Sequence, residues 1–132
     1  MMILQEYIAK FKSVFPQLTH EQPWRLTASM QQLIAEKITS LGEGFEIRND
    51  IAIHKSARVE DHTVIKGPAI ISAGCFIGTH AYLRGGVFLD DKVSIGPGCE
   101  VKSSVIFSGS ALAHFNFVGD SLLGSNANLE AG

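Results

Sequence analysis

The chain has 132 residues, 45% of them hydrophobic and 18% charged, which is enough for one hydrophobic core but not for two large domains. Its formal net charge is −2, and its 11 basic and 13 acidic residues are spread along the chain, without a basic stripe for nucleic acid or a polybasic patch for a membrane. The N-terminus carries charges where a signal peptide has an apolar segment, and no apolar run approaches the roughly 18 residues of a membrane span. These properties favour a cytoplasmic protein without nucleic-acid or membrane partners.

Two amphipathic helices are predicted near the N-terminus. The first ends before Pro16, and its apolar residues share one helical face: Ile3, Leu4, Tyr7, Ile8, Phe11, Val14 and Phe15. The second begins near Thr19 and Gln22, which have capping-box spacing, and Pro23 lies in its first turn. Its apolar stripe consists of Leu26, Met30, Leu33, Ile34, Ile38 and Leu41, and Gly42 is a stop signal. Such stripes are usually packing surfaces, so we expect the helices to cover the open end of the following domain or to pack between subunits.

From Ile51 onward the hydrophobic period changes to six. The large apolar residues of this register are Ile53, Val59, Ile65, Ile71, Ile77, Leu83, Leu89, Ile95, Val101 and Phe107. Two positions before them stand mostly small or β-branched residues: Ile51, Ala57, Thr63, Ala69, Cys75, Ala81, Val87, Val93, Cys99 and Val105. An even period keeps the marked side chains on one face of an extended segment, so each repeat forms a flat wall. Cys75 and Cys99 lack metal-ligand spacing and are expected to be reduced core residues.

Three such walls close a triangular coil of about eighteen residues, with large side chains inside and polar residues at the corners. We therefore predict a mainly β protein, a parallel β-helix of about four coils preceded by two α-helices. Residues 1–45 form the predicted helical segment and residues 46–132 the β-helix. A coil buries its apolar face only against its neighbours, so both ends need covers. Because the sequence stops in mid-repeat at residues 129–132, we expect either a fragment of a longer protein or a partner that covers this end.

The period slips after Val101. The next apolar positions of the register are Ile106, Leu112, Val118, Leu123 and Leu129. The steps from 101 to 106 and from 118 to 123 are therefore five residues instead of six. Irregular steps in a strict repeat are often where function is placed, and this segment contains His114.

Three stretches carry a resemblance to a known family: AYLRGGVFLDD at 81–91, CEVKSSVI at 99–106 and AHFNFVGDSLLGSNANLEAG at 113–132. Residues 51–132 resemble the acetyltransferase domain of the bacterial bifunctional N-acetylglucosamine-1-phosphate uridylyltransferase/glucosamine-1-phosphate acetyltransferase, and also archaeal sugar-phosphate nucleotidylyltransferases. The resemblance implies a left-handed parallel β-helix that assembles as a homotrimer. It also implies that acetyl-CoA, as co-substrate, and a sugar phosphate or nucleotide sugar bind between subunits.

The resemblance assigns roles to individual residues. His114 matches the general base that takes a proton from the sugar amine while the amine attacks the thioester of acetyl-CoA, and histidine suits this role because its ordinary pKa is near neutrality. Arg84 and Lys102 match residues that hold the phosphate or diphosphate of the substrate. Asn128 matches a sugar-contacting asparagine.

Asn116 and Phe117 complete the predicted substrate-binding set. Phe117 stands where the family commonly has a tyrosine whose hydroxyl contacts the substrate, so this hydrogen bond is lost. The family's catalytic domain continues for several more coils that bind acetyl-CoA, and this sequence does not contain them. A glycine-rich nucleotidylyltransferase motif is also absent from the sequence, so uridylyl transfer by this chain is not expected.

Two functions remain open from the sequence: an acetyl-CoA-dependent acyltransferase, or a non-catalytic β-helix that binds a nucleotide sugar or a partner subunit. The alternative interpretation of His114 is a corner residue that faces solvent, and that of the two cations is solvated charge on the outer walls. His62 and His80 are eighteen positions apart and are expected to stack on neighbouring coils. The next position in this series is Gly98, so a third ligand is missing and no metal site is predicted.

Overall fold

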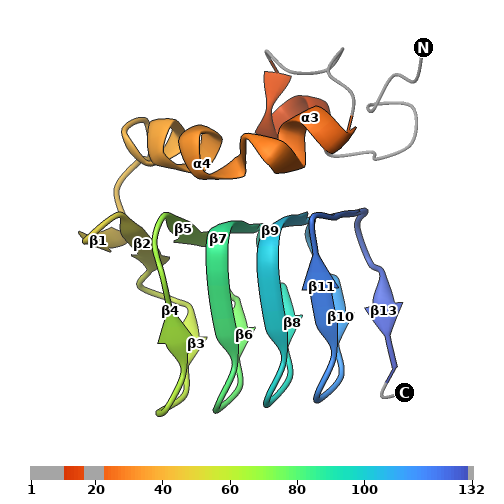
Figure 1. Ribbon diagram of the computed structural model, residues 1–132. Helices are drawn as coiled ribbons and strands as arrows, with labels where there is room; N and C mark the ends of the chain where they lie inside the picture. Colours follow the sequence, from red (N-terminus) through yellow and green to blue (C-terminus); the bar gives the residue numbers. More distant parts are fainter. Residues whose placement is uncertain (1–10, 17–22, 131–132) are drawn as a thin grey trace.

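The computed structural model describes residues 11–16 and 23–130 (Figure 1). In these residues the helices are α2 (Phe11–Val14), α3 (Pro23–Ala28) and α4 (Met30–Ile38). α3 and α4 make up most of the second predicted helix, which a turn at Ser29 divides in two. The predicted helical positions 3–10 and the capping positions 19–22 lie outside the described residues. No helix in the described part of the chain is long and apolar enough to cross a membrane.

The rest of the described chain is a β-solenoid of about four turns. It begins with β1 (Phe45–Arg48), which pairs antiparallel with β2 (Ile51–His54). The following strands are parallel: β3 (Arg58–Val59), β4 (Val64–Ile65), β5 (Ala69–Ile71), β6 (Phe76–Ile77), β7 (Tyr82–Leu89), β8 (Ser94–Ile95), β9 (Glu100–Ile106), β10 (Ala111–Leu112), β11 (Phe117–Gly119), β12 (Leu122–Leu123) and β13 (Asn128–Leu129). The predicted parallel β-helix is confirmed, and its left-handed sense stays a prediction.

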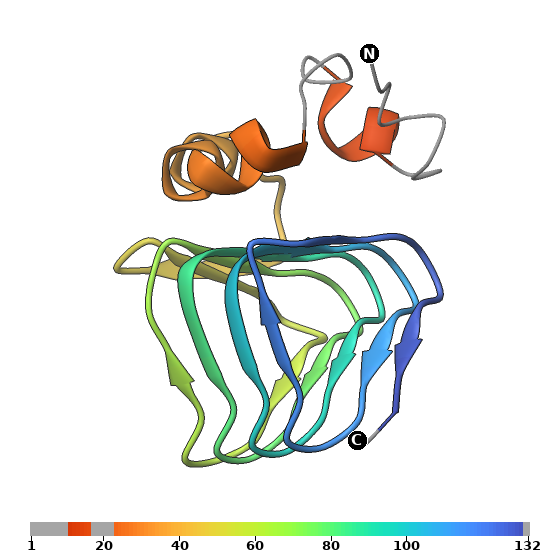
Figure 2. The same ribbon diagram turned by 45° about the vertical axis from the view of Figure 1, so that its right-hand side comes forward.

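The strands stack into three walls, and Figure 2 shows them as the sides of a prism. The first wall contains β2, β5, β12 and the C-terminal parts of β7 and β9. The second contains β3, β6, β8, β10 and β13, and the third contains β4, β11 and the N-terminal parts of β7 and β9. Equivalent residues of successive coils are in register, as Ile53, Ile71 and Leu89 are on the first wall. Each coil is therefore stabilised mainly by its neighbours.

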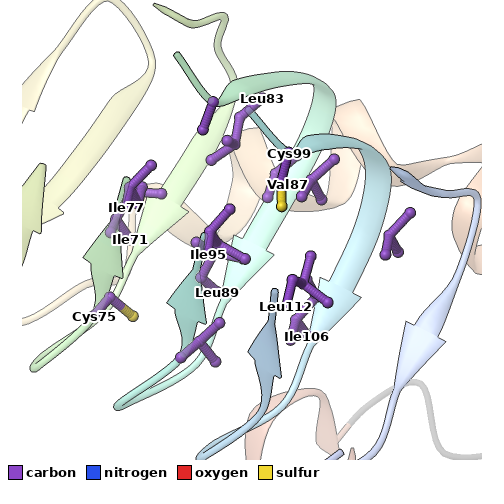
Figure 3. Packing of buried hydrophobic residues seen from close by; sticks show 14 residues of the cluster. Ile71, Cys75, Ile77, Leu83, Val87, Leu89, Ile95, Cys99, Ile106 and Leu112 are labelled. Carbon is purple, nitrogen blue, oxygen red and sulfur yellow. The ribbon is translucent and has the colours of Figure 1, made fainter. Parts of the chain in front are cut away.

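The predicted large residues fill the interior. Those of the middle coils are fully buried (Figure 3), namely Ile71, Ile77, Leu83, Leu89, Ile95 and Val101, and those of the first coil, Ile53, Val59 and Ile65, are partly buried. Cys75 and Cys99 are free thiols buried in the same core, as predicted. Burial raises the pKa of the Cys75 thiol to about 11 and also raises the pKa of Cys99.

Phe107 is not an interior residue of the solenoid, and this part of the prediction was wrong. Ile106 pairs with Leu89 and fills the core, while Phe107 packs among the residues that lie under the helices. The cause is the corner between the third and first walls, where the two residues 85–86 lie opposite the single residue Ser103. The coil that starts here is one residue shorter, which explains the five-residue step in the sequence.

The helices pack along the first wall and not over the open end of the solenoid, which was one of the two expected positions (Figures 1 and 2). Packing of the helices between subunits stays a prediction. The buried residues of α4 are Met30, Ile34 and Ile38, and they belong to one cluster with Ala52, Ile70, Phe88 and Val105, which face outward from this wall. A sheet that is apolar on both faces needs a cover on its outer side. This requirement determines where α4 lies.

Candidate functional site

The second and third walls meet at an edge where each coil turns through one residue with a left-handed backbone. In successive coils this residue is His62, His80, Gly98 and Phe115, with φ between 61° and 70°. We call this row the aromatic edge. The Phe115 ring lies over Gly98, because a Cβ atom at Gly98 would be 2.5 Å from two carbons of the ring. Gly98 therefore makes room for Phe115.

His114 stands next to Phe115 on this edge, at the corner after β10. Its side chain is exposed, and its ring meets the Phe115 ring edge to face, with centroids 5.4 Å apart and an angle of 87° between the planes. Within the described residues, no hydrogen bond to the imidazole is found. An exposed imidazole of this kind is available to accept a proton from a bound ligand. The irregular corner after Lys102, where the six-residue period is broken, lies between the third and first walls and is a different corner of the coil.

Arg84 and Lys102 lie on the outer face of the third wall, in register on neighbouring coils. Each has a carboxylate partner: Arg84 Nε donates to Glu100 Oε2 at 2.7 Å, and Lys102 Nζ donates to Asp120 Oδ2 at 3.1 Å. These four side chains are only partly buried, so solvent screens the two ion pairs. An arriving phosphate can therefore compete for both cations.

Phe117 and Asn128 lie on opposite sides of the edge that carries His114. Phe117 is on the third wall, where it pairs in register with Glu100, and 61% of it is exposed. Asn128 is on the second wall, exposed, and its Nδ2 donates to Glu130 Oε1 at 3.0 Å. The structure thus brings Arg84, Lys102 and Phe117 together on one wall beside His114, with Asn128 on the other.

Asn116 is not part of this surface group. It occupies the small position of its repeat, in the column of Thr63, Ala81 and Cys99, and is half-buried. Its Nδ2 donates to the carbonyl oxygens of Ala113, Leu129 and Glu130 at 3.0, 3.3 and 3.2 Å. These bonds tie the amide to the corner of its own coil and to the next coil. These bonds stabilise the solenoid, and a substrate contact by Asn116 stays a prediction.

The predicted stacking of His62 and His80 is confirmed, with ring centroids 5.4 Å apart and an angle of 24° between the planes. In the ranges that the structure describes, no group of three or more histidine, cysteine, aspartate or glutamate side chains is arranged to hold a metal ion. The position after His80 in this row is Gly98, which has no side chain that could bind a metal ion. The two imidazoles therefore form a pair of flat, polar rings on the aromatic edge.

Sequence reasoning missed Glu100 and Asp120, the counter-ions of the two cations. The signal was present in the spacing, because Asp120 is eighteen positions after Lys102 and Glu100 is sixteen after Arg84. In a coil of about eighteen residues, such spacings place side chains on neighbouring coils. Each of the two cations is thus paired with one carboxylate on a neighbouring coil.

Comparison with known proteins shows similarity to bacterial proteins named bifunctional protein GlmU. The one from Desulfitobacterium hafniense (strain DSM 10664 / DCB-2) is 35% identical over 109 residues, which cover 76% of this chain and 24% of that protein. The one from Heliobacterium modesticaldum is 36% identical over 105 residues, covering 76% and 23%. The one from Leifsonia xyli subsp. xyli is 47% identical over 64 residues, covering 48% and 13%.

The chain spans about a quarter of the length of the first two of these relatives. No family model matches the chain. The similarity and the β-solenoid together confirm the resemblance predicted from the three sequence stretches. They do not assign a role to any individual residue.

Proposed function

Starting from a hexapeptide-repeat solenoid that is similar to bifunctional GlmU proteins over 76% of its length, we propose that this chain is an acyltransferase. The reaction is transfer of the acetyl group of acetyl-CoA to the amine of an amino-sugar phosphate or nucleotide sugar. The observation that carries the proposal is the exposed His114 imidazole beside a wall that presents Arg84 and Lys102 in register. A base next to two fixed cations suits a substrate that has an amine at one end and phosphate at the other.

In the proposed reaction, the nitrogen of the sugar amine attacks the thioester carbonyl carbon. His114 takes the proton that the nitrogen loses, the carbon–sulfur bond breaks, and the leaving thiolate of coenzyme A receives this proton. Arg84 and Lys102 hold the phosphate, which fixes the distance between the amine and the imidazole. Arg84 uses only Nε in its bond to Glu100 among the described residues, so the terminal nitrogens of its guanidinium remain for phosphate.

We further propose a homotrimer with acetyl-CoA bound between subunits in the cytoplasm. His114 lies on a convex, exposed edge, and one convex edge cannot shield a reacting thioester from water. Two large apolar side chains flank it, Phe115 with 80% and Phe117 with 61% exposed. A second chain packed against this edge would bury both rings and supply the second side of the site.

A second candidate function is a non-catalytic module that binds a nucleotide sugar or a partner subunit. One observation favours it. The His114 ring has no hydrogen-bonded orienting group in the described residues, whereas catalytic bases are usually oriented by one.

The release of free thiol from acetyl-CoA separates the two functions. The full chain is incubated with acetyl-CoA and glucosamine-1-phosphate or uridine-diphosphate-linked glucosamine, and the thiol is measured. We expect thiol release by the unchanged chain, and we expect its rate to fall by a factor of about 10² to 10⁴ in His114→Asn, the range typical of a lost general base. Lys55→Met is the matched control, because Lys55 is exposed at a different corner of the solenoid. Release that is absent, or that is equal in His114→Asn, would exclude the enzyme function.

A further inference from the structure

The third wall continues past Arg84 into a hollow at the first two coils. The hollow has a volume of about 350 Å³ and is lined by His62, Val64, Lys66, His80, Ala81 and Tyr82. It adjoins the group around His114 because the same wall carries both, through the register of β4 with β7 and of β7 with β9. None of the residues predicted from the sequence as a site residue lines it.

The cations of the third wall form a ladder with one member per coil. Lys66, Arg84 and Lys102 follow one another along neighbouring strands, which are about 4.8 Å apart in a sheet. Lys66 and Arg84 both lie over the Tyr82 ring, with Nζ and Cζ at 5.4 and 5.8 Å from its centroid. Among the described residues, Lys66 has no carboxylate at ion-pair distance, in contrast to the other two cations. The exposed Lys66 ammonium is therefore the most available cation of the ladder for an anion.

The far side of the hollow is made of flat rings. The imidazoles of His62 and His80 are stacked on the aromatic edge and are both exposed. Val64 lies between His62 and Lys66 in the chain, and half of it is exposed. His80 Nδ1 is 3.0 Å from Thr79 Oγ1, which leaves Nε2 for another partner. A hollow with an apolar floor, stacked rings and a cation at its rim suits an aromatic base attached to phosphate.

The order of these groups along the solenoid axis is the order of the parts of a nucleotide sugar. His114 is on the fourth coil, Lys102 and Arg84 on the third and second, and the hollow on the second and first. We infer that the hollow binds the base and ribose of a nucleoside diphosphate, so that the amino sugar acted on is nucleotide-linked. This inference rests on the proposed function only where it says that an amino sugar linked to the nucleotide is acetylated. The binding of the nucleotide itself does not depend on acetyl transfer.

Calorimetric titration of the full chain with uridine diphosphate tests the inference, with inorganic diphosphate as the reference ligand. Because the rings contribute only to base binding, we expect uridine diphosphate to bind at least about tenfold more tightly than inorganic diphosphate. His80→Asn removes the ring and keeps a residue that tolerates the left-handed φ of 64°. This variant should lose about tenfold in affinity for uridine diphosphate, and Lys66→Met should lose affinity for both ligands. Lys55→Met, which removes an exposed lysine from another corner of the first coil, should lose none.

The outcomes separate this inference from the proposed function. Equal affinities for uridine diphosphate and inorganic diphosphate, or unchanged uridine diphosphate binding in His80→Asn, would overturn the inference even if thiol release from acetyl-CoA is observed. Tight, ring-dependent binding of uridine diphosphate without thiol release would support the hollow and contradict the acyltransferase. Thermal unfolding of each variant shows whether a loss of binding comes from a loss of folding.

Discussion

At the scale of single residues, the corners of the coils determine what the aromatic edge presents. A left-handed backbone is unfavourable for residues with a Cβ atom, and yet His62, His80 and Phe115 adopt it at successive turns. The hydrogen bonds between coils keep these residues in this conformation, for example from Phe115 N to the carbonyl of Pro97 at 3.0 Å. The rings are thereby held outward on the edge that also carries His114, and the Phe115 ring is in contact with it.

Gly98→Ala tests the role of glycine on this edge. The substitution places a Cβ atom against the Phe115 ring at a residue with a φ of 70°, so we expect a loss of about 2 kcal/mol in the free energy of unfolding. Gly124→Ala is the matched control, since no atom lies within 4 Å of its added Cβ and its φ is not in the left-handed range. Urea unfolding measures both. Equal stability of the two variants would show that Phe115 does not depend on Gly98.

The buried thiol of Cys75 makes stability depend on pH in the alkaline range. Burial raises its pKa from 9.0 to about 11, so between these values the folded chain keeps a proton that the unfolded chain releases. The free energy of unfolding should therefore fall by about 2 kcal/mol as the pH rises from about 9 to about 11. Urea unfolding at both ends of this range, compared with Cys75→Ala, isolates the contribution of this thiol. An identical pH dependence in the variant would contradict it.

At the scale of elements, the sequence predicts the solenoid better than it predicts the position of the helices. The interior register repeats every six residues because each wall contributes one large side chain, and this pattern is visible from Ile53 to Val101. The cover over the first wall depends on a second, outward column. Its sequence signal is the adjacent pairs and triplets of apolar residues at 70–71, 87–89 and 105–107, spaced by about one coil. A single six-residue register does not include this column.

For the candidate site, too, the sequence predicts some features and not others. Positions on a coil follow from counting, so the neighbourhood of Arg84 and Lys102 can be predicted from their spacing of eighteen. Counting also places Asn116 in the small column of the repeat, two positions before Val118, while Phe117 points to the opposite face. Counting does not predict that the Asn116 amide donates to three carbonyl groups, because these bonds depend on the exact path of the corner.

Phe88→Ala tests the packing of the helices on the first wall. Phe88 is 4% exposed and lies under α4, where Lys37 Nζ is 5.7 Å from its ring centroid. We expect a loss of about 3 to 5 kcal/mol in the free energy of unfolding, as for other large core truncations. Phe76→Ala is the control, because Phe76 is half-buried on the outer face of the second wall and no helix covers it in the described structure. A loss in Phe88→Ala no larger than in the control would mean that α4 is not docked there in solution.

At the scale of the whole molecule, the proposed site requires an assembly. The candidate base, two large exposed rings and the cation ladder all lie on one exposed edge and the wall beside it. An exposed edge becomes an enclosed site only when another surface packs against it. The proposed partner is a second copy of the same chain.

Sedimentation equilibrium tests the assembly directly. We expect a mass of three times the 14.3 kDa of the chain at micromolar concentration. Phe117→Glu should shift the distribution toward the monomer, because a charge would replace an apolar side chain in the proposed contact. A protein that is monomeric at all concentrations would contradict the proposed trimer.

The most direct test of the central claim is the identity of the product. Acetyl-CoA labelled with carbon-13 in its acetyl group is incubated with the full chain and an amino-sugar phosphate or its uridine-diphosphate-linked form, and the sugar is examined by NMR. The account predicts a labelled acetyl group on the sugar nitrogen, formed about 10² to 10⁴ times more slowly by His114→Asn and at an unchanged rate by Lys55→Met. Label that stays on coenzyme A, or that reaches the sugar equally fast with His114→Asn, would contradict it.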